Sequence, residues 1–230
     1  MESNFNIEIE YKNVPRFESG SEESIEYLEE QGYVVIKNAL SSSEAAKTLE
    51  LLWDYLEGLD TGIDRNDVST WGDERWPTCA HGGIMPSYGI GHSEAQWYLR
   101  GIPNVKKAFA KIWNTDELLT SFDGVSLWRP WNINSDWKTE SGQSWFHIDQ
   151  HPISKPGKQC IQGLVNLLPT SKEIGGNVII PESHNFFKNI PKEYEERLGR
   201  LPLDIDHFRF PNDDPKLSSK PAVMLSLIHI

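Results

Sequence analysis

The stretch from Ser144 to Pro152, SWFHIDQHP, places His147 and Asp149 two residues apart in an aromatic run. In an extended strand, residues i and i+2 point to the same face, with their side chains only a few ångströms apart. Two such side chains can bind one metal ion. The alternative is an ordinary half-exposed strand that carries two polar side chains.

Composition limits the functions open to this chain. Its 230 residues, 38% of them hydrophobic, are enough for a sizeable core, and we predict one domain. The net charge of -12 argues against nucleic acid or an anionic membrane surface as a partner. No apolar run approaches the roughly 18 residues of a membrane span, and the start lacks a signal-peptide pattern. We therefore expect a cytoplasmic protein that acts on a small molecule.

The two cysteines, Cys79 and Cys160, lie far apart and form no CxxC pattern. We expect both to be buried small apolar residues, without a disulfide or a metal role.

Helical patterns come first in the chain and strand-like patterns follow. Ser21 precedes a helical run that stops at Gly32, and Ser41 with Glu44 forms a capping-box pattern before a second one. We predict an α+β domain whose strands form a sandwich or barrel. The predicted helices span residues 21–32, 41–58, 92–100 and 104–114, and the predicted strands lie within 33–38, 121–131, 144–152, 160–169 and 176–183.

An imidazole and a carboxylate without a thiolate suit Fe(II), and a second imidazole would complete a 2-His-1-carboxylate face. Arg129, between two tryptophans in LWRPW, could bind a carboxylate or simply stack on indoles at the surface. Strand alternation in CIQGLVNLL puts Gln162 and Asn166 on one face, either as a core network or as hydrogen-bonding groups of a pocket.

Five segments taken in order, LEEQGYVVIKNALSSSEAAKTLELLW, FDGVSLWRPW, WFHIDQHP, CIQGLVNLL and GGNVIIPESH, resemble the phytanoyl-CoA dioxygenase-like family of Fe(II)- and 2-oxoglutarate-dependent oxygenases. The resemblance runs from about residue 24 to residue 184. It implies a double-stranded β-helix, a cupin-like jelly roll, with the N-terminal helices packed outside. It also implies that His147 and Asp149 are iron ligands.

On this resemblance we expect a dioxygenase that uses Fe(II), O₂ and 2-oxoglutarate to hydroxylate a small organic substrate. Arg129, Gln150, Gln162 and Asn166 are the candidates for binding the co-substrate. The alternative is a non-catalytic jelly-roll protein that binds a small molecule. A zinc hydrolase would need a third protein ligand and a base, and the sequence offers neither.

The chain departs from the family pattern at its C-terminal side. In the family, the third ligand is a later histidine followed by an arginine that binds 2-oxoglutarate, whereas the histidine of the PESH motif, His184, is not the usual ligand. His207 and His229 are the remaining candidates, and neither follows a strand of the expected kind.

The last six residues, LSLIHI, look like the translation of a sequencing-library adapter. We therefore expect a natural sequence that ends near Val223 or Met224, in a truncated chain that lacks its final strands and its third ligand. The expected organisation is an N-terminal arm at residues 1–20, a single oxygenase domain at 21–223 and an artefactual tail at 224–230.

Overall fold

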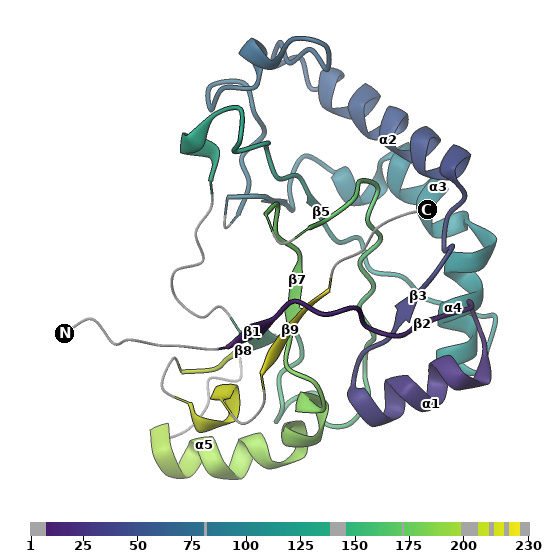
Figure 1. Cartoon of the computed structure of the whole chain (residues 1–230), viewed down its shortest axis with the longest axis vertical. Coiled ribbons are helices and arrows are strands. Elements are labelled where there is room, and N and C mark those ends of the chain that lie inside the picture. Colours follow the sequence, from purple (N-terminus) through teal and green to yellow (C-terminus); the bar gives the residue numbers. More distant parts are fainter. Residues whose placement is uncertain are drawn as a thin grey trace.

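The computed structural model describes residues 8–80, 82–138, 146–171, 173–198, 207–211, 214–218 and 221–225. Within these ranges the structure has five α-helices and four small sheets, and four of the helices precede residue 114. In Figure 1, α1 to α4 lie along the right side of the sheets and α5 lies below them. The helices are α1 Glu22–Gln31, α2 Ser42–Glu57, α3 Glu94–Gly101, α4 Pro103–Trp113 and α5 Ile190–Leu198. Among the described residues, none of these helices is long and apolar enough to cross a membrane.

Local capping explains where the first two helices begin and end. The Ser21 side chain accepts the Ser24 N–H at the start of α1, and Gly32 ends that helix with a left-handed φ of 79°. Ser41 and Glu44 form the expected capping box at the start of α2. Both predicted helices are confirmed.

Helices α3 and α4 are also confirmed, and Pro103 occupies the first turn of α4, where its missing N–H costs nothing. The spacing of Val105, Ala108, Phe109 and Ile112 in the sequence predicts that α4 buries an apolar stripe. That expectation was wrong in degree, because none of its residues is fully buried and Phe109 and Ile112 stay half-exposed.

The strands are short. They are β1 Ile9–Glu10, β2 Arg16–Phe17, β3 Val35–Ile36, β4 Ile84–Met85, β5 Val125–Ser126, β6 His147–Ile148, β7 Asn177–Ile179, β8 Phe208–Arg209 and β9 Ala222–Leu225. Strand β9 lies between β1 and β7, parallel to β1 and antiparallel to β7. The other pairs are β2 with β3, β4 with β5, and β6 with β8.

The described strands form no closed barrel, so the double-stranded β-helix stays a prediction. The predicted strand within residues 160–169 is wrong, because this segment has neither strand nor helix in the structure. Residues 8–20 hold β1 and β2, and Met224 and Leu225 lie in β9. Residues 1–7 of the expected arm and 226–230 of the expected tail, including His229, lie outside the described residues.

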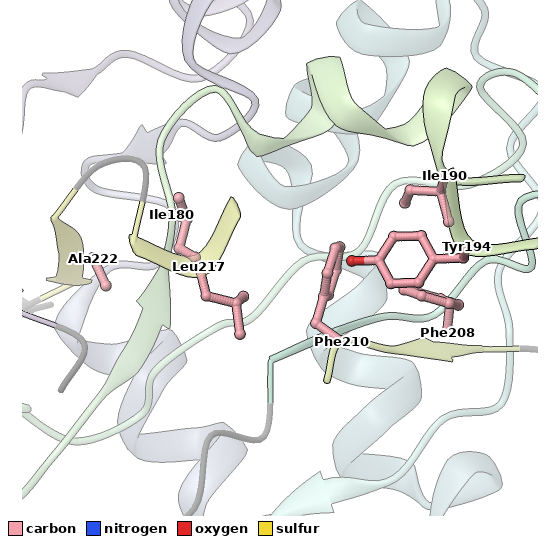
Figure 2. Close-up of a cluster of buried hydrophobic side chains, with 7 residues drawn as sticks. All are labelled: Ile180, Ile190, Tyr194, Phe208, Phe210, Leu217 and Ala222. Atoms are coloured by element: carbon pink, nitrogen blue, oxygen red, sulfur yellow. The ribbon is translucent and has the colours of Figure 1, made fainter. Parts of the chain in front are cut away.

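The two largest apolar clusters among the described residues lie in different parts of the fold. One joins α2 and α3 to β4 and β5 through residues such as Leu52 and Met85. The other, shown in Figure 2, surrounds Tyr194 of α5, whose ring packs edge-on against Phe208 and Phe210. The Tyr194 hydroxyl donates a hydrogen bond to the buried carboxylate of Asp214. This second cluster supports β6, the strand that carries His147 and is followed directly by Asp149.

Candidate functional site: an imidazole and a carboxylate on strand β6

The antiparallel pair of β6 and β8 separates an apolar face from a polar face. Ile148 lies opposite Phe208, and both contribute to the cluster around Tyr194. Because side chains alternate along a strand, His147 and Arg209, which lie opposite each other, point to the other face. The Phe210 N–H donates to the Phe146 carbonyl at 3.0 Å and extends the same register.

His147 and Asp149 meet on this polar face. Nε2 of His147 lies 3.3 Å from Oδ1 of Asp149, and their side chains are 27% and 43% exposed. The chain bends at Asp149, just beyond β6, and still keeps its carboxylate beside the imidazole. The pair is therefore accessible from solvent and rests on a buried apolar support.

Gln162 joins this pair from a distant loop. Its Nε2 donates a 2.7 Å hydrogen bond to Oδ2 of Asp149. The loop reaches this position because Gly163 packs against α4, where a Cβ would lie 2.7 Å from Cζ of Phe109. The amide thus holds one carboxylate oxygen and orients the other toward His147.

The structure places the other three predicted co-substrate residues in different contacts. Gln150 donates to the carbonyls of Lys155 and Gly157 and accepts from the Gln159 N–H, so its amide closes a local loop. Asn166 Nδ2 lies 3.5 Å from Thr170 Oγ1. As contacts to a co-substrate, both stay predictions.

Arg129 does bind a carboxylate, but one of its own chain. Its guanidinium donates to Asp73 at 2.6 Å and to the Trp71 carbonyl at 2.9 Å. Its guanidinium also lies over the rings of Trp76 and Trp137. Arg129 therefore both binds a carboxylate and stacks on indoles, the two alternatives considered for LWRPW.

The described part of the chain holds no group of three His, Cys, Asp or Glu side chains that could bind a metal. His184 lies instead at the C-terminal end of α1, where its Nε2 is 3.0 Å from the Glu29 carbonyl. His207 is exposed and precedes β8, and His229 lies outside the described residues.

Arg209 also lies on the polar face of β6 and β8, and no role for it was predicted from the sequence. It follows His207 by two residues in DIDHFRF, but only the strand register brings it opposite His147. A period-two pattern of buried Phe208 and Phe210 with exposed His207 and Arg209 was the available signal.

The cysteines differ from the expectation. Cys160 is exposed, and Cys79 is half-buried. Burial raises the pKa of the Cys79 thiol. Neither cysteine is part of the His-x-Asp pair.

Two curated proteins are similar to this chain. "Ava biosynthesis cluster protein O" from Aspergillus versicolor is 33% identical over 189 residues, covering 81% of this chain and 59% of that protein. "Putative phytanoyl-CoA dioxygenase" from Dictyostelium discoideum is 27% identical over 198 residues, covering 70% of this chain and 55% of that protein. The chain thus spans less than two thirds of the length of either relative. No family model matches it, and no solved structure matches it.

Proposed function

The chain is related to the phytanoyl-CoA dioxygenase-like family, and we propose that it is an Fe(II)- and 2-oxoglutarate-dependent dioxygenase that hydroxylates a small organic substrate. The observation that carries this proposal is the pairing of His147 Nε2 with Asp149 Oδ1 at 3.3 Å on an accessible face. The double-stranded β-helix of the family is part of the same proposal.

The donor set fits the proposed metal. One imidazole nitrogen and one carboxylate oxygen, without thiolate, suit Fe(II). Nε2 of His147 and Oδ1 of Asp149 lie 3.3 Å apart, so both atoms could hold one ion.

When bound, Fe(II) would supply the redox chemistry with O₂ and the 2-oxo acid. The residues of the chain supply position and charge. Asp149 brings the negative charge that a cation needs, and Gln162 fixes its rotamer through Oδ2. Arg209, opposite His147, places a positive charge on the face where an acidic co-substrate would bind.

The remaining parts of the proposal concern the surroundings of the protein. A small-molecule substrate, 2-oxoglutarate and O₂ are the proposed partners, and the net charge of -12 supports the exclusion of nucleic acid and anionic membranes. A cytoplasmic location is supported by two cysteines that are both free.

Isothermal titration calorimetry under nitrogen tests the proposal, with Mn(II) as a redox-inert substitute for Fe(II). Mn(II) should bind to the parent protein, and 2-oxoglutarate should bind more tightly in its presence than in its absence. In air, the Fe(II) protein should release succinate from 2-oxoglutarate. Ligand binding that does not depend on a metal, without succinate release, would instead favour the non-catalytic binding protein.

A further inference from the structure

His151, two residues after Asp149, is a buried histidine, and one of its ring nitrogens has no partner in the described part of the chain. The residue is 1% exposed. Nδ1 accepts hydrogen bonds from the N–H groups of Ile153 at 3.3 Å and Ser154 at 3.1 Å. The Lys155 N–H also donates to the His151 carbonyl at 3.0 Å, so the ring caps a tight turn.

These contacts decide where the proton of the ring lies. A nitrogen that accepts two N–H groups carries no hydrogen, so the proton of the imidazole is on Nε2. Nε2 is buried and has no hydrogen-bond partner among the described residues. The turn therefore holds a donor in the interior that no described residue satisfies.

A buried donor of this kind requires an explanation, because most buried polar atoms in proteins have a partner. Buried water typically makes about three hydrogen bonds and is held poorly by one. The other unpartnered buried side-chain atoms among the described residues, Thr61 Oγ1 and Trp76 Nε1, belong to the loop between α2 and β4. Neither belongs to the turn that holds His151.

A ligand that is held mainly by other groups, unlike a buried water, needs only one hydrogen bond from His151. The Cα atoms of Asp149 and His151 are at most about 7 Å apart, because each residue spans no more than about 3.6 Å. A small molecule bound at the His147 and Asp149 pair would therefore lie near His151. Because Nε2 is buried, the turn at residues 151–155 would have to open for the ligand to reach it.

We propose that Nε2–H of His151 is a binding group that donates to a carboxylate or keto oxygen of a 2-oxo acid bound beside His147 and Asp149. This inference rests on the proposed function. It adds a donor that the His-x-Asp pattern does not contain.

Two substitutions separate ligand binding by Nε2 from the hydrogen bonds that Nδ1 accepts within the turn. In His151→Asn, Oδ1 stands where Nδ1 stood and can still accept the Ile153 and Ser154 N–H groups, as asparagine does in turns, but the outer donor is lost. In His151→Gln, the amide reaches toward the Nε2 position, but the acceptor of the cap is lost.

Calorimetry with 2-oxoglutarate and excess Mn(II) measures the result. His151→Asn should weaken 2-oxoglutarate binding about three- to tenfold, the effect of one hydrogen bond, and leave Mn(II) binding unchanged. His151→Gln should lower folding stability more than His151→Asn, yet retain more of the affinity for 2-oxoglutarate.

Several outcomes would overturn the assignment. If the parent and His151→Asn bind 2-oxoglutarate within twofold of each other, His151 has no such role, although the proposed function survives. If neither protein binds Mn(II) or 2-oxoglutarate, the proposed function fails and this inference fails with it. A nuclear Overhauser effect between the Nε2 proton and a long-lived water, in ¹⁵N-histidine-labelled protein, would show that water is the partner instead.

Discussion

His147 and Arg209 lie directly opposite each other across the antiparallel pair of β6 and β8, 62 residues apart in the sequence. Side chains at such positions share one face, with Cβ atoms about 5 Å apart. The guanidinium therefore belongs to the same face as the carboxylate of Asp149. A positive and a negative charge side by side suit the joint binding of a cation and an acidic ligand.

Replacing Arg209 tests this arrangement. Arg209→Gln should weaken 2-oxoglutarate binding about three- to tenfold, because a charge-assisted contact to a carboxylate is lost. Mn(II) binding should not weaken, because the removed charge repels the ion. Calorimetry measures both constants, and Arg75→Gln, which removes an arginine that donates to the Gly62 carbonyl, is the control. Equal losses in the two variants would contradict a local role for Arg209.

The two proposed metal ligands should respond more strongly to substitution than their neighbours. His147→Ala or Asp149→Ala should abolish Mn(II) binding and succinate formation, because each removes a ligand atom. Gln162→Ala removes only the group that orients Asp149 and should cost about 10- to 100-fold. The exposed His92 is the control, as His92→Ala. Activity within tenfold of the parent in either ligand variant would remove the assignment.

Gly32 should be hard to replace. Its φ is 79°, and a Cβ there would collide with the ring of His184. We expect Gly32→Ala to lower the free energy of unfolding by about 1–2 kcal/mol. Gly101→Ala is the matched control: it ends α3, and its Cβ would meet nothing within 4 Å. That variant should be neutral or more stable by up to about 1 kcal/mol in urea unfolding.

The loop after α2 should loosen in acid. Hydrogen bonds from Arg65 lower the pKa of Glu57 below its ordinary value. Its contribution to stability is therefore present above the unfolded pKa of about 4.3 and is lost as the pH falls through the lower folded pKa. Between pH 6 and pH 3, the free energy of unfolding should therefore fall less in Glu57→Gln than in the parent protein. In the control Glu26→Gln, an exposed change on α1, it should fall as much as in the parent.

Local signals explain which parts of the fold the sequence could predict. Ser21, Gly32, Ser41 and Glu44 act within one turn of their own helices, so α1 and α2 were found with their ends. Helix α5 was missed because its described apolar side chains, such as Ile190 and Tyr194, give only a short stripe in a charged segment.

Distant contacts explain the rest. The segment of residues 160–169 has an alternating pattern, yet it packs as a loop because Gly163 fits against Phe109 of α4. Spacing alone placed His147 beside Asp149. The contact of Gln162 with Asp149 and the register of Arg209 with His147 depend on how remote segments meet, which no local pattern contains.

Strand β9 lies at the centre of its sheet but is the last of the three strands to be synthesised. Ile9 pairs with Ala222 and Glu10 with Val223, so β1 acquires its neighbour only after about 200 further residues have been added. At roughly 5–20 residues per second, a ribosome needs about 10–40 s for that interval. Strand β7 is made only about 45 residues before β9, so it lacks this partner during the last part of the interval alone, while α1 to α4 can already fold. Until β9 is made, the nascent chain would depend on chaperones to protect the edges of β1 and β7 from other proteins.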